Sequence, residues 1–457
     1  MSARNRELLA LLPVALLVTA GLTAVFIVRS NEIGDLSLTY GAYFLGVCLA
    51  VHVMIRLRLP NADPYLFPLV ALLAAFGLVI LFRIDESLAL KQASLFLLGL
   101  GFFAATIIFL RDYHVLERYR YLIAMVGIGL LVLPRLPGIG EQVNGAYLGI
   151  KVGGISFQPA EFAKICIVIF LASYLREKRE VLIVGARRVM GVILPPLKHL
   201  GPLLVVWGAA MLMLVFIRDL GSSLMFFAAF LALLYVATSR VSFVVIGMLL
   251  FVAGAWFFAN TVPHVENRVD IWLDPFEDTQ GSGFQVAQSL FAQADGGLFG
   301  AGLGESLMQL PDASKGCIDQ FPECGSIIPA PHTDLIYAVI TNELGLFGAA
   351  GVVLIYILIA ARGFKTAVMA RDGFSKLLAA GLTAVFSLQA FVIIGGVVRV
   401  IPLTGVTLPF ISYGGSSVVA NMVLLALLLM ISNDARRPDR EAAEPEIQLR
   451  GPVGRTA

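Results

Sequence analysis

The stretch "PAPHTDLIYAVITNELGLFG" runs from Pro329 to Gly348 and carries one carboxylate before an apolar run and one inside it. Asp334, like Thr333, can cap the helix that begins here, and its charge suits the helix dipole. The same carboxylate would also stand at the right height to act as a general base toward a lipid-anchored substrate. Glu343 lies about 13 Å further along such a helix. We therefore expect Glu343 to face a polar cavity or a partner such as Lys164.

A second pair of charges begins another apolar run, "QPAEFAKICIVIFLASYL". Glu161 and Lys164 are three residues apart, so they share one helix face and can neutralise each other. Ionisable groups at membrane depth are costly and often functional. The local sequence leaves two interpretations open, an ion pair that only fixes packing and a charged wall of a cavity for a phosphate-bearing ligand.

Two more segments have residues suited to an anionic headgroup. "IRDLGSS" places Arg218 and Asp219 between two apolar runs, either as a solvated turn or as a headgroup contact. "GGLFGAGLG" (296–304) is either a flexible glycine-rich loop or a set of turns whose N–H groups bind an anion.

The segment "RVIPLTGVTLPFISYGGSS" (399–417) combines two prolines with a glycine pair, ahead of the last apolar run. This composition predicts non-helical backbone at membrane depth. Such backbone is tolerated only where it is buried in protein or lines a cavity. We therefore interpret the segment as part of a site.

The elements that must position these residues are membrane-spanning helices. Of 457 residues, 58% are hydrophobic and only 14% charged, with a mean hydropathy of +0.87. A soluble protein carries about a quarter charged residues. The net charge of +2 gives no indication of nucleic-acid binding. We predict an all-α, polytopic integral membrane protein with spans of the required length, at approximately 8–28, 37–55, 66–82, 91–110, 120–134, 159–176, 201–217, 222–237, 241–261, 335–361, 375–397 and 408–432.

Basic residues in the short loops set the orientation. They gather in "RDYHVLERYR" (111–120), "REKREVLIVGARR" (176–188) and "ARGFKTAVMARDGFSK" (361–376), which predicts that both termini are cytoplasmic. The long segment 262–334 is then outside, and loops of such length are usually functional or disordered. We interpret the charged residues 433–457 as a disordered cytoplasmic tail.

Four cysteines divide between membrane and loop. Cys48 and Cys166 fall in spans and behave as small apolar residues. Cys317 and Cys324 fall in the external segment, where an oxidising environment permits a disulfide. Two free thiols are the alternative, and the spacing is a poor match to a metal site.

Six stretches together resemble the RodA/FtsW family of shape, elongation, division and sporulation proteins. They occur in family order over about residues 66–432: "FQPAEFAKI", "RDLGSS", "WLDPFEDTQGSGFQVAQSL", "GGLFGAGLGES", "PHTDLIYAVITNELG" and "PLTGVTLPFISYGGSS". The resemblance implies a ten-helix glycosyltransferase core, so residues 1–57 would form two extra N-terminal helices.

The resemblance also implies an activity, which is polymerisation of lipid II into peptidoglycan glycan strands at the outer face of the bacterial cytoplasmic membrane. The reaction would be an inverting glycosyl transfer that releases undecaprenyl pyrophosphate. The essential acid falls on Asp334. The resemblance and the polar positions above give the candidate substrate-binding residues Glu161, Lys164, Arg218, Asp219, Glu343, Arg399, Ser412 and Ser416. No cofactor is certain, and a divalent cation (Mg or Mn) is left open.

Three departures from the family pattern stand out. Tyr147 and Leu148 occupy positions where many relatives have Arg-Trp. The stretch 312–330 is longer than usual. Thr404 replaces a lysine of division-type members, which favours the elongation type.

The implied partners are membrane lipids, the lipid-linked substrates and a class B penicillin-binding protein that cross-links the strand. Two rivals from other classes are a lipid II flippase, for which intramembrane charges and broken helices would suit, and a non-catalytic scaffold. A division-type polymerase is the alternative within the family.

Overall fold

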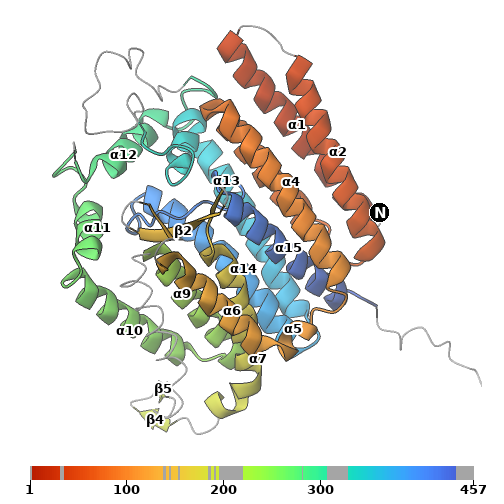
Figure 1. Cartoon of the computed structure of the whole chain (residues 1–457), viewed down its shortest axis with the longest axis vertical. Coiled ribbons are helices and arrows are strands. Elements are labelled where there is room, and N and C mark those ends of the chain that lie inside the picture. The colour runs from red at the N-terminus through yellow and green to blue at the C-terminus, as the bar shows by residue number, and fades with distance from the viewer. Residues whose placement is uncertain are drawn as a thin grey trace, which may run out of the picture.

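The structure is a computed structural model, shown in Figure 1. It describes residues 3–30, 35–136, 140–143, 146–152, 155–183, 187–189, 192–194, 220–279, 281–305 and 328–438. In this part of the chain nine helices are long and apolar enough to cross a membrane. The predicted all-α, polytopic membrane fold is confirmed.

The long helices follow the predicted apolar spans closely. They are α1 (Ala3–Ser30), α2 (Asp35–Arg58), α3 (Leu66–Ile84), α4 (Glu86–Phe109), α6 (Arg120–Val132), α7 (Ala160–Ile183), α9 (Leu220–Thr238), α10 (Val241–Ala259), α13 (Ile336–Met369), α14 (Gly373–Val397) and α15 (Gly415–Ala435). The predicted span 201–217 lies outside the described residues.

Shorter elements connect these helices. They are the helices α5 (Val115–Arg118), η1 (Leu133–Arg135), α11 (Pro263–Leu273) and α12 (Phe284–Gly296), an antiparallel sheet of β1 (Gly140–Val143), β2 (Ala146–Val152) and β3 (Ile155–Phe157), and a hairpin of β4 (Arg187–Val189) and β5 (Val192–Leu194). In Figure 1, α10, α11 and α12 form an arc along one side of the helix bundle.

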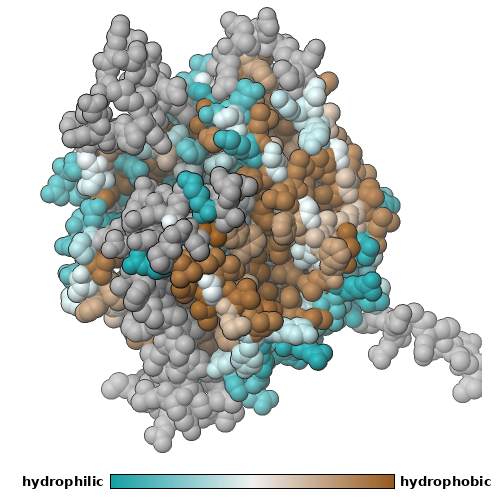
Figure 2. All heavy atoms as spheres, viewed as in Figure 1, coloured by the Kyte–Doolittle hydropathy of each residue, from teal (hydrophilic) through white to brown (hydrophobic). Residues whose placement is uncertain are grey.

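The surface matches a protein that is surrounded by lipid. Large apolar side chains are exposed on the outward faces of the helices, for example Leu16 on α1 (69%) and Trp256 on α10 (71%). In Figure 2, apolar residues dominate the flank formed by α1, α2 and α4, and hydrophilic residues gather toward its two ends. Apolar surface of this extent is stable in a bilayer and not in water.

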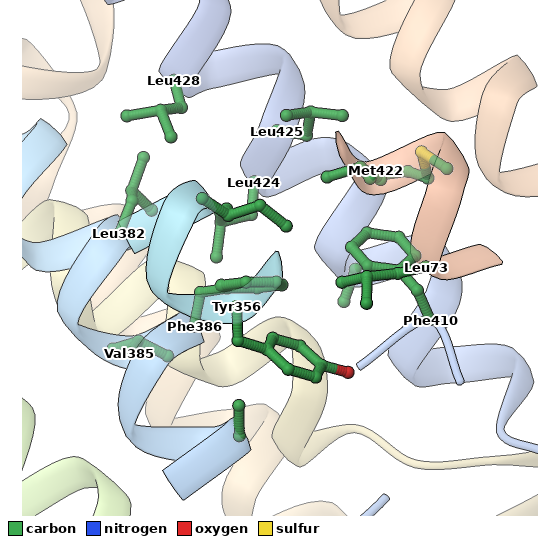
Figure 3. Close-up of a cluster of buried hydrophobic side chains, with 14 of the residues drawn as sticks. Leu73, Tyr356, Leu382, Val385, Phe386, Phe410, Met422, Leu424, Leu425 and Leu428 are labelled. Atoms are coloured by element: carbon green, nitrogen blue, oxygen red, sulfur yellow. The ribbon is translucent and has the colours of Figure 1, made fainter. Parts of the chain in front are cut away.

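The core lies between α13, α14, α15 and the non-helical segment before α15. Figure 3 shows Tyr356, Phe386 and Phe410 packed together with leucines of α14 and α15. The Tyr356 hydroxyl donates a hydrogen bond to the carbonyl oxygen of Pro409 (2.6 Å). A buried hydroxyl therefore satisfies a backbone carbonyl of the irregular segment, as burial requires.

Ion pairs hold the cytoplasmic ends of the helices together. Asp63 is fully buried between α2 and α3, and it accepts hydrogen bonds from Arg362 of α13 (2.6 Å) and Arg436 after α15 (2.7 Å). Arg4 of α1 donates to Glu7 and to the carbonyl oxygen of Ala62. Paired buried charges of this kind are costly to break. This network fixes the extra N-terminal helices to the core.

Candidate active site

Asp334 precedes the first residue of α13 by two positions, and the backbone around it is fixed by the segment before α15. The Ser412 hydroxyl donates to the carbonyl oxygen of Thr333 (2.7 Å) and accepts from the amide of Leu408 (2.9 Å). The amide of Tyr413 donates to the carbonyl oxygen of His332 (2.8 Å). Ser412 thus holds the backbone of the residue just before Asp334.

The capping role considered for Asp334 or Thr333 is wrong. The N-cap of α13 is Leu335, and no side chain accepts a hydrogen bond from the first turn. The Thr333 hydroxyl instead donates to the carbonyl oxygen of Ala330. Asp334 therefore does not cap α13, although its position in the sequence suggested that it would.

The Asp334 carboxylate faces the backbone of Gly405. A Cβ atom placed on Gly405 would lie 3.5 Å from Oδ2 of Asp334, and the φ of 72° at Gly405 is disfavoured for other residues. Among the described residues, no donor makes a hydrogen bond to this carboxylate. Burial raises its pKa to about 6, although the positive charge of Arg268 acts in the opposite direction. A half-buried carboxylate without a donor is poised to accept a proton near neutral pH.

Arg268 of α11 was not identified from the sequence. Its Nη1 donates to the carbonyl oxygen of Leu403 (2.5 Å), two residues before Gly405, and its charge acts on Asp334. It stands in the external segment, where a basic residue gives no local signal of function. The structure therefore adds a cation to the site beside Asp334.

Glu161 and Lys164 form the predicted pair, and both are buried. Lys164 Nζ donates to Glu161 (2.5 Å), to Gln389 of α14 (2.6 Å) and to Asn421 of α15 (3.2 Å). Gln389 also donates to Glu161 (3.1 Å) and to the carbonyl oxygen of Thr407 (3.0 Å). The network joins three helices to the segment that faces Asp334. Because Lys164 is fully enclosed, its charge is already compensated.

Two further contacts attach other helices to the same segment. The amide of Gln158, just before α7, donates to the hydroxyl of Ser416 (2.9 Å). Gln92 of α4 donates to the carbonyl oxygen of Ser412 (3.1 Å) and accepts from the amide of Gly414 (3.2 Å). Gln92 was not predicted, because one neutral amide in an apolar helix carries little information.

Glu343 is fully buried, but its predicted partner Lys164 is wrong. Its carboxylate pairs with Arg83 at the end of α3 (3.1 Å) and accepts from the amide of Gly304 (3.1 Å). The helix turns at Gly345, where φ is 64°. The sequence gives the depth of Glu343 along its helix, but it does not show which helix packs against it. For this reason the sequence pointed to the wrong partner.

The glycine-rich segment 296–304 makes backbone hydrogen bonds to α13 just before its kink at Gly345. The amide of Ala301 donates to the carbonyl oxygen of Asn342 (2.9 Å), and that of Gly302 donates to the carbonyl oxygen of Glu343 (3.0 Å). One further amide, that of Gly304, donates to the Glu343 carboxylate, an anion of the chain itself (3.1 Å). This segment therefore supports the wall of the site.

Arg399 makes contacts that hold α11 in place. Its Nε donates to the carbonyl oxygen of Trp272 (2.7 Å), and its Nη2 donates to that of Leu273. The indole N–H of Trp272 donates back to the carbonyl oxygen of Arg399 (3.2 Å). Since Arg268 lies on α11, Arg399 contributes to the position of Arg268.

Arg218, Asp219, Cys317 and Cys324 lie outside the described residues. The start of α9 directly after Asp219 packs tightly on the site, because a Cβ atom on Gly221 would meet Val406 at 2.3 Å. Within the described ranges, no group of three or more His, Cys, Asp or Glu side chains is arranged to hold a metal ion.

Comparison with known proteins identifies the family. A model of the FtsW/RodA/SpoVE family, described as cell cycle protein, matches residues 64–437. The chain belongs to this family. It is 41% identical over 452 residues to the peptidoglycan glycosyltransferase RodA of Mycobacterium tuberculosis, with 96% of this chain and 92% of the relative covered.

Two other similar proteins are more distant. A probable peptidoglycan glycosyltransferase FtsW of Geobacter is 29% identical over 389 residues, with 83% of this chain and 99% of the relative covered. A chain in a solved structure, described as "Structural coordination of polymerization and crosslinking by a peptidoglycan synthase complex", has a TM-score of 0.64 and 25% identity, covering 82% of this chain and 99% of that one. Because the alignment with the Mycobacterium tuberculosis relative covers 96% of this chain, it extends into α1 and α2. These two helices precede the residues that the family model matches.

Proposed function

We propose that this protein is a peptidoglycan glycosyltransferase of the elongation type, which joins lipid II disaccharide units into glycan strands at the outer face of the cytoplasmic membrane. The observation that carries the proposal is the Asp334 carboxylate. It is half-buried, it receives no hydrogen bond from the described residues, and it stands at the start of a membrane-spanning helix. Relatives that share the fold are named for this activity.

Asp334 is the proposed general base. It takes the proton of the sugar 4-hydroxyl of lipid II as that oxygen attacks the anomeric carbon of the lipid-linked strand. The bond from that carbon to undecaprenyl pyrophosphate breaks, with inversion. General-base catalysis contributes about 10²–10⁴-fold. With a pKa of about 6, the carboxylate is mostly ionised at neutral pH and still basic enough to accept the proton.

The leaving pyrophosphate gains negative charge, which a fixed cation can stabilise. Among the described residues, Arg268 is the cation that acts on Asp334. It is therefore a stronger candidate than Lys164 for stabilising the pyrophosphate. Lys164 is enclosed by Glu161, Gln389 and Asn421, so its role is to hold the segment 399–417 in place. Ser412 and Ser416 also hold this segment in place, whereas Glu343 pairs with Arg83 and binds the glycine-rich segment. Arg218, Asp219 and Arg399 remain candidates for headgroup contacts.

The elongation type is supported by the comparisons, since the RodA relative is 41% identical and the FtsW relative 29%. Thr404, where division-type members carry a lysine, agrees with this assignment. The proposed partner is a class B penicillin-binding protein. The structurally similar chain comes from a complex described as coordinating polymerization and crosslinking.

The test is lipid II polymerisation by the purified protein, alone and with its penicillin-binding partner. We expect long glycan from the wild type and from Asp295→Asn, which alters an exposed carboxylate of α12. We expect almost none from Asp334→Asn. Movement of lipid II across vesicle membranes without any elongation would instead favour the flippase, and glycan synthesis by Asp334→Asn would remove the proposed base.

A further inference from the structure

An open apolar pocket lies between the N-terminal helices and the core. Four helices contribute to it, α1 through Val18, α2 through Tyr40 and Phe44, α3 through Phe82, and α4 through Ala93 and Phe96. All of its lining residues are apolar or aromatic. A lining of this kind excludes sugars and phosphates, because they would lose their hydrogen bonds to water.

The pocket lies in the outer half of the predicted membrane span. Phe82 is two residues before the outer end of α3, and Ala93 is about 10 Å along α4 from its outer end at Glu86. The hydrocarbon core is about 30 Å thick. The pocket is therefore at the depth of hydrocarbon tails in the outer leaflet, the leaflet from which a lipid-linked substrate would reach Asp334.

The pocket and the candidate active site share the helices α3 and α4. Arg83, the residue after Phe82, pairs with Glu343. On α4, Gln92 binds Ser412 and Gly414, while the next residue, Ala93, lines the pocket. The helices α3 and α4 thus have one face against the site and another face against the pocket.

We propose that this pocket binds the polyprenyl tail of the lipid-linked substrate, so that α1 and α2 contribute a tail-binding site to the enzyme. The proposal rests on the proposed function. Its two supports are the purely apolar lining at outer-leaflet depth and the shared helices α3 and α4, which place a tail in the pocket next to the site that its headgroup must enter. A tail bound here contributes binding through buried hydrocarbon area.

The first experiment compares lipid II with its full-length tail against an analogue with a short prenyl tail. Ala93→Trp fills the pocket, and Leu90→Trp narrows its rim at a half-exposed position that tolerates bulk. Leu16→Trp is the matched control, because Leu16 points away from the protein on α1. We expect both pocket variants to raise KM about tenfold for the long tail, with kcat and the KM for the short tail unchanged. The control variant retains wild-type constants for both substrates.

The second experiment uses a photoreactive polyprenyl phosphate as the probe, on the wild-type protein in phosphatidylglycerol vesicles. We expect labelling of peptides from α2 and α4 that undecaprenyl phosphate competes away and that Ala93→Trp abolishes. Equal KM changes for both tails, or labelling that added phosphatidylglycerol competes equally well, would overturn the proposal. If the wild type makes no glycan but is labelled in α2 and α4, the proposed function fails while the tail site stands.

Discussion

The pKa of Asp334 makes a quantitative prediction for the pH dependence of polymerisation. Burial raises that pKa from 3.8 to about 6, a shift that corresponds to about 3 kcal/mol against the ionised form. About 90% of the carboxylate is then ionised at pH 7 and about 10% at pH 5. If Asp334 is the base, kcat/KM falls about tenfold between these pH values. An ordinary carboxyl, with a pKa of 3.8, would lose less than a tenth of its ionised form over the same interval.

The assay is the initial rate of lipid II polymerisation from pH 4.5 to 8, with folded protein verified at each pH. Asp295→Asn serves as the control and should give the wild-type profile. A profile that is flat from pH 5 to 7 would refute the link between the raised pKa and the rate. Folding stability has the opposite sign, because the raised pKa favours the protonated form in the folded state. This contribution is fully present below about pH 4 and is lost as the pH rises through about 6.

Three further predictions concern the surroundings of Asp334. Arg268→Gln removes the charge that lowers the pKa of Asp334, so the acidic limb of the pH–rate profile should move to higher pH. An unchanged limb would contradict this role of Arg268. Glu266→Gln on the same helix is the control. Lys164→Met leaves Glu161 buried without its counter-ion and should destabilise the protein by about 3–5 kcal/mol. Adding Glu161→Gln should recover much of the lost stability, measured by thermal unfolding. If the double variant recovers no stability, the two residues are not coupled. Gly300→Ala places a Cβ atom 2.1 Å from a backbone oxygen at a φ of 83°, so it should lower both Tm and activity, whereas Gly101→Ala, with open space around it, should change neither.

The sequence predicted the elements that depend on local patterns. Apolar runs located the membrane helices, and the spacing of Glu161 and Lys164 predicted their ion pair, which the structure has at 2.5 Å. The prolines and glycines of 399–417 predicted irregular backbone, and the described residues 401–408 are non-helical. In each of these cases the information lies within a few residues of the feature that it specifies.

Partners on distant helices could not be predicted in the same way. Gln389 and Asn421 contact Lys164 across 225 and 257 residues, and each is one neutral amide in an apolar helix. Glu343 pairs with Arg83 because α13 packs on α3, an arrangement that helical periodicity does not specify. Arg268 depends on the path of the external segment, which brings α11 beside Leu403.

The most direct test of Asp334 as the general base is single-turnover polymerisation of lipid II by Asp334→Asn at pH 7, together with its thermal unfolding. Asn keeps the size of the side chain and removes the buried charge, so we expect the rate to fall by about 10²–10⁴-fold and the unfolding temperature to stay the same or rise. A folded Asp334→Asn protein that polymerises lipid II at the wild-type rate would contradict this assignment.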